Sequence, residues 1–87
     1  MIERLAWTAT GWSDYLYWQA NDRKTLRRIN QLIKDTMRHP ETGIGKPEAL
    51  RENLSGFWSR RIDQQHRLVY AIDPDQLTII SCRYHYE

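Results

Sequence analysis

Cysteine is nearly absent from the 87 residues, and the single one, Cys82, can form no intramolecular disulfide. A secreted scaffold held by disulfides is therefore excluded, as are zinc sites built on several cysteines. The three histidines lack the spacing of metal ligands. The sequence also has no glycine-rich phosphate loop and no paired carboxylates typical of a two-metal nuclease, so we expect neither a metal nor another cofactor.

Long apolar runs are lacking too. The longest uninterrupted run, residues 68–72, is far shorter than the roughly 20 residues that a membrane-spanning helix needs. The first seven residues include Glu3 and Arg4 instead of the apolar core of a signal peptide. We therefore expect a cytoplasmic protein that does not associate with a membrane.

The composition is that of one small globular domain. A chain of 87 residues allows a single domain, 1–87, and excludes a multidomain enzyme. Four tryptophans and five tyrosines supply large units of buried area to a core that must be small. The net charge of +2 permits a nucleic-acid partner without demanding one.

Two consecutive helices are predicted between residues 8 and 38. Thr8 or Thr10 can cap a first helix that ends near residue 20, and Asp22 can cap a second helix over residues 23–38. Because the connection is short, we expect an antiparallel hairpin. The first helix carries a stripe that we interpret as core packing rather than a base-stacking surface: Trp12, Tyr15, Leu16, Tyr17 and Trp18.

The second helix is the most basic stretch of the chain. It contains one acidic residue, Asp35, and six basic ones: Arg23, Lys24, Arg27, Arg28, Lys34 and Arg38. Such a helix presents either a solvated face or a docking surface for phosphates or an acidic partner, and the pattern leaves both interpretations open.

Three strands are predicted in the second half of the chain. Residues 39–47 hold two prolines and two glycines and form a loop. Strands follow at 57–62, 66–72 and 77–84, joined by turns of hairpin length. With an edge strand at residues 3–7, the order is strand, helical hairpin and antiparallel β-meander, which is an α+β fold.

Basic residues collect at the ends of these strands: Arg60, Arg61, Arg67, Arg83 and His85. The helical hairpin can cover only one face of the sheet, so we expect them on the open face near Tyr84 and Tyr86. Cations mixed with aromatic rings suit single-stranded nucleic acid. Charged residues are nevertheless common on any solvated sheet face, so the pattern alone does not decide.

Several longer motifs resemble those of one family. GKPEAL at 45–50, NLSGFWSRRI at 53–62, HRLVYAI at 66–72 and CRYHY at 82–86 closely resemble the YoeB family of bacterial toxins, within the RelE/ParE superfamily. DYLYWQ at 14–19 and RINQLIKDT at 28–36 fit as well. The resemblance runs from about residue 5 to residue 86 in one register and implies the RelE/ParE-like fold.

The resemblance implies a ribosome-dependent endoribonuclease, an mRNA interferase that cuts mRNA in the ribosomal A site. Its partners would be the bacterial ribosome and a YefM-type antitoxin, which covers the active site. Operator DNA would be contacted only through the antitoxin complex, and the resemblance allows a homodimer. The alternative is a toxin of the same fold that inhibits DNA gyrase by binding and cleaves no RNA.

The family's functional residues map onto this chain by position. The resemblance makes Glu48 the general base, Arg67 the phosphate-binding arginine and His85 the general acid. The remaining expected site residues are Tyr86 at the active site, Arg61 beside the phosphate, and Lys46 and Arg51 as flanking RNA contacts.

The C-terminus raises a geometric question. Strand alternation sets His85 and Tyr86 on opposite faces, so both reach one site only if the chain twists or leaves the strand there. Glu87 adds a carboxylate after the tyrosine at which family members often end.

Overall fold

The elements of the computed structural model, which describes residues 1–84, follow the predicted order. The bounds are β1 Arg4–Trp7, α1 Ala9–Asn21, α2 Arg23–Arg38, β2 Glu48–Ala49, the 3-10 helix η1 Glu52–Leu54, β3 Phe57–Arg61, β4 Arg67–Ile72 and β5 Gln76–Ser81. The predicted α+β fold is confirmed. The expected site residues His85 and Tyr86, and also Glu87, lie outside the described residues.

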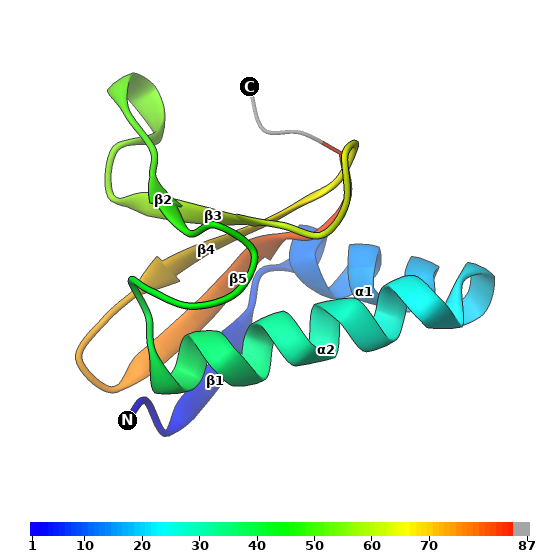
Figure 1. Ribbon diagram of the computed structural model, residues 1–87, viewed down its shortest axis with the longest axis horizontal. Helices are drawn as coiled ribbons and strands as arrows, with labels where there is room; N and C mark the ends of the chain where they lie inside the picture. The colour runs from blue at the N-terminus through cyan, green and yellow to red at the C-terminus, as the bar shows by residue number, and fades with distance from the viewer. Residues whose placement is uncertain (85–87) are drawn as a thin grey trace.

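One sheet of order β1-β5-β4-β3-β2 joins both halves of the chain (Figure 1). β1 is an edge strand, as predicted, and it pairs in parallel with β5. The other pairings are antiparallel, so β3, β4 and β5 form the expected meander. The opposite edge is β2, a two-residue strand within a region that the sequence did not indicate as a strand.

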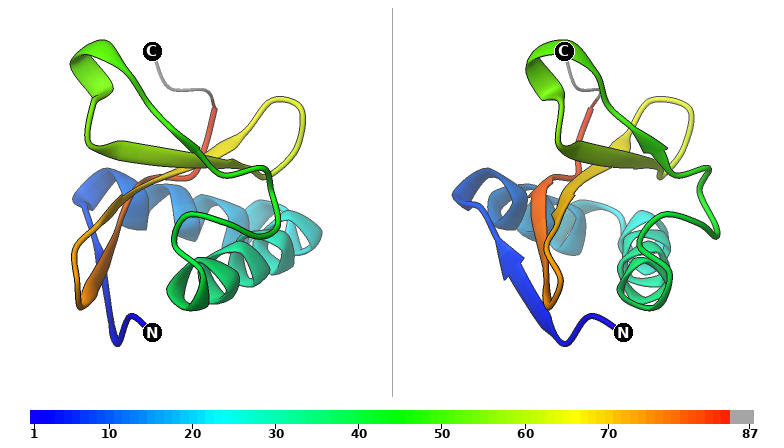
Figure 2. Two further views of the ribbon diagram at one scale, coloured as in Figure 1. Left: turned by 60° about the vertical axis from the view of Figure 1, so that its left-hand side comes forward. Right: turned by 90° about the vertical axis from the view of Figure 1, so that its left-hand side faces the viewer.

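Both helices lie against the same face of the sheet, while η1 rises on the other side (Figure 2). Thr8, not Thr10, caps α1 by accepting a hydrogen bond from the amide of Gly11 at 3.0 Å. Asp22 caps α2 through the amide of Thr25 at 3.1 Å. The single residue Asp22 separates the helices, which run side by side in opposite directions as predicted (Figure 1).

The core forms where α1 and α2 meet β4 and β5. It is built mainly from Trp18, Ile29, Leu32, Leu68, Tyr70, Leu77 and Ile79, with Cys82 also fully buried. The aromatic stripe of α1 serves this core only in part. Trp18 is buried and Tyr15 packs against the core, but Trp12 and Leu16 are 47% and 40% exposed.

The last strand ends at Ser81 instead of the predicted residue 84. The amide of Cys82 donates to Asp14 Oδ2 at 3.0 Å, and that of Tyr84 donates to His66 Nδ1 at 2.7 Å. These side chains replace the sheet ladder as acceptors, and Tyr84 has a φ of 64°. The chain therefore leaves the strand before His85. Across residues 1–84, no helix has the length and apolar character needed to cross a membrane.

Candidate functional site

Three of the expected site residues share the sheet face opposite the helices. Register pairs Glu48 with Ser59 and Arg61 with Arg67, and residues directly paired across strands project to the same side. Glu48 Oε1 lies 3.0 Å from Arg67 Nη1 in an ion pair. The Glu48 side chain is about half exposed, and that of Arg67 is 16% exposed.

The loop before β2 fixes the position of Lys46 and Glu48. The carbonyl of Gly45 accepts a hydrogen bond from the amide of Arg61 at 2.7 Å, which draws the loop onto β3. Gly45 has a φ of 82°, and a Cβ there would lie 2.7 Å from a methyl group of Leu32, so a side chain would strain the backbone and displace Leu32. Lys46 follows, exposed to solvent, with a φ of 52°.

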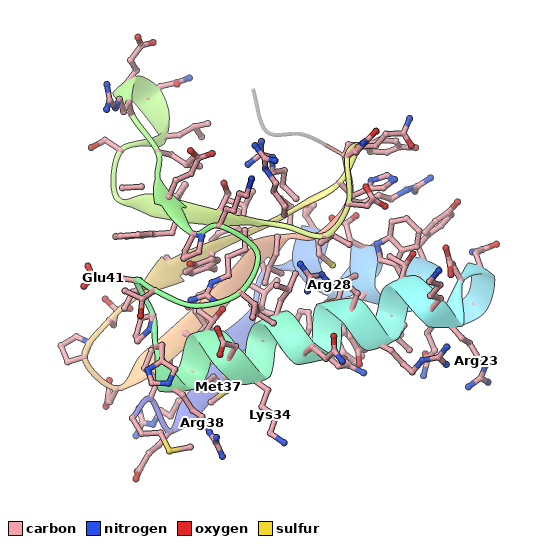
Figure 3. The ribbon with its side chains drawn as sticks, viewed as in Figure 1. Arg23, Arg28, Lys34, Met37, Arg38 and Glu41 are labelled. Atoms are coloured by element: carbon pink, nitrogen blue, oxygen red, sulfur yellow. The ribbon has the colours of Figure 1, made fainter. Side chains whose placement is uncertain are left out.

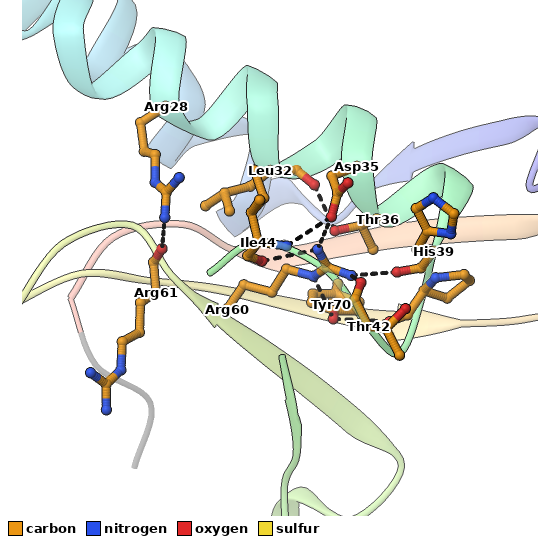
Figure 4. Close-up of polar contacts among 11 residues, drawn as sticks. Arg28, Leu32, Asp35, Thr36, His39, Thr42, Ile44, Arg60, Arg61 and Tyr70 are labelled. Atoms are coloured by element: carbon orange, nitrogen blue, oxygen red, sulfur yellow. Dashed lines mark hydrogen bonds and ion pairs between the residues drawn. The ribbon is translucent and has the colours of Figure 1, made fainter. Parts of the chain in front are cut away.

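Arg60 does not lie on the open face, and the prediction that placed it there is wrong. Its side chain is fully buried on the helix side of β3 and pairs with Asp35 Oδ2 at 2.7 Å (Figure 4). Its Nε donates to the Tyr70 hydroxyl at 3.0 Å. Its remaining donors reach three carbonyls of the loop that follows α2: His39, Thr42 and Ile44. Arg60 therefore anchors the loop that leads to Lys46 and Glu48.

Charges and hydrogen bonds reinforce this anchor. The guanidinium of Arg60 lowers the pKa of Asp35, whose Oδ2 also accepts from the amide of Ile44 at 3.0 Å. Burial raises the pKa of Tyr70, whose hydroxyl donates to the carbonyl of Pro40 at 3.1 Å. Asp35, the one acidic residue of α2, thus stabilises the packing of the loop against the helix.

Arg83 also departs from the expected open face. Its guanidinium lies 3.5 Å from the ring centre of Tyr17 on α1 and 4.6 Å from that of Tyr84. The backbone of Tyr84 is held on both sides, because its amide donates to His66 Nδ1 and its carbonyl accepts from the amide of Arg67 at 3.1 Å. The residue before His85 is therefore tied to the strand that carries Arg67.

Two hollows adjoin the Glu48–Arg67 pair. One, of about 700 Å³, is lined by residues 48–54 and includes Glu48 and Arg51. The other, of about 380 Å³, is lined by Arg61 and Arg67 together with the β3–β4 turn and Arg28. Among the described residues, the structure brings together Glu48, Arg61 and Arg67, with Arg51 beside Glu48.

Arg28 is a residue of this surface that the expected site did not include. It lies on the side of α2 that faces the strands, while Lys34 and Arg38 project from the opposite side (Figure 3). Its Nη2 donates to the carbonyl of Arg61 at 3.2 Å (Figure 4). The signal available in the sequence was helical spacing, since Arg28 lies one and two turns before Leu32 and Asp35 on one stripe.

Comparisons with known proteins identify the family to which this chain is similar. Residues 7–86 match the model of a family described as the YoeB-like toxin of bacterial type II toxin–antitoxin systems. The chain is 59% identical to Toxin YoeB of Escherichia coli K12 over 83 residues, 95% of this chain and 99% of that protein. It is 58% identical to Toxin YoeB of Synechocystis over 84 residues, 97% and 98% of the two chains.

Solved structures show the same fold. The YoeB/ParE toxin from Agrobacterium tumefaciens superposes with a TM-score of 0.94 at 43% identity and covers 97% of this chain and all of that one. The YoeB dimer from Staphylococcus aureus gives a TM-score of 0.90 at 44% identity over 99% of this chain and all of that one. A YoeB–YefM complex from the same organism gives 0.89 at 42% identity, covering 99% of both chains.

Proposed function

The chain belongs to the YoeB-like family of toxins from bacterial type II toxin–antitoxin systems, and on this basis we propose that it is a ribosome-dependent endoribonuclease acting on mRNA in the ribosomal A site. The observation that supports the proposal is the 3.0 Å pair of Glu48 and Arg67. A proton acceptor and a phosphate-binding cation, 19 positions apart in the sequence, meet on an open sheet face.

The reaction begins at the ribose 2′-OH. The carboxylate of Glu48 takes its proton, and the 2′-oxygen attacks the adjacent phosphorus. A guanidinium has five N–H donors, so Arg67 can hold Glu48 and a phosphoryl oxygen at once. Arg61, paired with Arg67 across β3 and β4, adds charge stabilisation as negative charge builds on the phosphoryl oxygens.

The reaction ends when the bond from phosphorus to the 5′-oxygen breaks. His85 donates a proton to that oxygen, with Tyr86 beside it, leaving a 2′,3′-cyclic phosphate and a 5′-hydroxyl. The backbone contacts of Tyr84 with His66 and Arg67 support this assignment, because they end the described chain next to the phosphate-binding arginine. Lys46 and Arg51, both exposed beside Glu48, contact the flanking RNA.

The partners follow from the relatives. Structures of relatives are described as a YoeB–YefM complex and as a YoeB dimer, so this chain binds a YefM-type antitoxin and forms a homodimer.

Primer extension on an mRNA bound to bacterial ribosomes tests the activity. Wild type should cut within the A-site codon, and Glu48→Gln or His85→Ala should slow cleavage by about 10²–10⁴-fold, the usual contribution of one proton transfer. Glu41→Gln, a change of an exposed carboxylate in the loop before β2, is the matched control and should keep the wild-type rate.

Two outcomes would contradict the proposal. Wild-type cleavage by Glu48→Gln would remove this residue from the mechanism while keeping the enzyme. Failure of folded wild type to cut, together with inhibition of gyrase supercoiling, would establish the binding toxin instead.

A further inference from the structure

A basic groove extends from the phosphate-binding face toward α2. The 380 Å³ hollow beside Arg67 adjoins a second hollow of about 370 Å³, lined by Lys24, Thr25, Arg28, Ile62 and Asp63. The two share Arg28, Ile62 and Asp63, so they form one continuous groove. Its charged lining consists of one carboxylate, Asp63, and four cations: Lys24, Arg28, Arg61 and Arg67.

Arg28 is the centre of this groove and is held in place. It is half-buried, and its bond to the carbonyl of Arg61 fixes the guanidinium at the end of β3. Within residues 1–84, no carboxylate lies within ion-pair distance of Arg28 or Arg61. The guanidinium of Arg28 is therefore oriented without being neutralised, which suits an anion that arrives from solution.

The carboxylate of Asp63 offsets only one of the four positive charges that line the groove. Its Oδ1 accepts from the amides of Gln65 and His66 at 2.8 and 2.7 Å, so it stabilises the turn between β3 and β4. The groove thus keeps an excess of positive charge beside the Arg61–Arg67 pair.

We propose that this groove is a second phosphate subsite, in which Arg28, supported by Lys24, binds a backbone phosphate of the same RNA strand next to the one that is cleaved. The inference rests on the proposed function, because it takes Arg67 as the contact of the scissile phosphate. Arg28, Arg61 and Arg67 line one hollow, so a strand whose scissile phosphate lies at Arg67 has two further cations within the same hollow. Cations at successive phosphates are the pattern of single-strand binding.

The groove lies along only one side of the basic helix α2. Arg28 shares a hollow with Arg67, whereas Lys34 and Arg38 lie on the opposite side of α2 (Figure 3). The basic helix therefore has two surfaces, and only the one with Lys24 and Arg28 continues the site. Arg27, the neighbouring arginine, is exposed and lines neither hollow.

Cleavage on programmed ribosomes, with toxin in excess, tests the subsite. Arg28→Gln should raise the half-saturating toxin concentration about tenfold while the maximal rate stays within about twofold, because the contact is made in ground state and transition state alike. The dependence of log affinity on log salt should become shallower by about 0.7, the value for one phosphate contact on a single strand. Arg27→Gln, the neighbouring arginine, is the matched control and should change neither quantity.

A modified RNA identifies the contact. An uncharged methylphosphonate is placed at one linkage at a time on either side of the scissile phosphate. One of these substitutions should weaken wild type about tenfold and should cause no further loss in Arg28→Gln. Equal effects of Arg27→Gln and Arg28→Gln, or methylphosphonate losses that add to that of Arg28→Gln at every linkage, would overturn the subsite.

A binding assay separates this result from the proposed function. Anisotropy of a fluorescent 2′-O-methyl single-stranded RNA on the free protein uses the same variants and the same methylphosphonates. If wild type cleaves nothing, the proposed function fails, and the subsite is still decided by the difference between Arg28→Gln and Arg27→Gln in binding. A loss confined to an acidic antitoxin peptide, with RNA binding unchanged, would assign the groove to a protein partner and refute the subsite.

Discussion

Replacing Arg60 with methionine should lower the free energy of unfolding more than any substitution on the open sheet face. Arg60 is fully buried, and its guanidinium bonds Asp35, Tyr70 and three loop carbonyls. Methionine keeps most of the side-chain volume but has no N–H group to donate to any of these partners. Breaking one side of a buried pair costs about 3–5 kcal/mol. Because the Asp35 side chain is 25% exposed and can bind water again, we expect the free energy of unfolding to fall by about 3 kcal/mol.

Urea unfolding followed by tryptophan fluorescence measures this loss. Linear extrapolation gives the free energy of unfolding, and a fall of about 3 kcal/mol corresponds to a lower Tm by about 12–24 °C in a domain of this size. Arg61→Met is the matched control, since Arg61 is the exposed neighbour on the same strand and should change stability by less than about 0.5 kcal/mol. Equal losses in Arg60→Met and Arg61→Met would refute the reasoning.

The pairing of Asp35 with Arg60 should also make the stability of the protein depend on pH. The pKa of Asp35 in the folded protein lies below its ordinary value of 3.8, chiefly because it accepts a hydrogen bond from Arg60. The stability that this carboxylate contributes is therefore present above pH 3.8 and is lost as the pH falls through the folded pKa. The free energy of unfolding should fall less steeply below pH 3.8 in Asp35→Asn than in wild type. Parallel curves for the two proteins would contradict this assignment.

Three further experiments test other contacts. Gly11→Ala should destabilise the fold by about 1–3 kcal/mol in urea, because the new Cβ would lie 2.5 Å from the carbonyl oxygen of Ile79; an unchanged midpoint would contradict this close approach. Burial raises the pKa of Cys82 to about 12, so a thiol reagent at pH 8 should modify it only after unfolding, and comparable rates in native and denaturing buffer would show the burial to be wrong. His66→Leu removes the acceptor for the Tyr84 amide and should slow mRNA cleavage about tenfold, whereas His66→Asn, whose side-chain oxygen can replace Nδ1, should restore much of the rate; equal rates in the two variants would refute a positioning role.

Elements with their own local signal were predictable from the sequence. Asp22 marks the boundary between two helices because it is a good N-cap, and α2 begins and ends at the predicted residues 23 and 38. Apolar runs and turn residues likewise placed the meander, although its last strand ends three residues early. The strand β2 was not predictable, because two residues carry no periodicity and become a strand only by pairing with β3.

The location of Arg60 was missed because its partners are distant in sequence. Alternation places it with Trp58 and Ile62, which points to the covered face, but a charged residue is seldom fully buried unless it is paired. Its ion partner Asp35 is 25 residues away, and the loop carbonyls converge only after folding. The available signal was a single carboxylate on the apolar side of an otherwise basic helix.

Arg60 and Arg61 show how one strand couples the core to the site. They are adjacent on β3, so the pleat sends one guanidinium to Asp35 and the other to the face that carries Arg67. A shift of one residue in register would exchange them and leave an unpaired cation in the core, a cost that fixes the register. The same register sets Glu48 opposite Ser59 and thereby brings its carboxylate to Arg67. The buried arginine thus determines where the proposed base and phosphate-binding residues meet, although it touches neither.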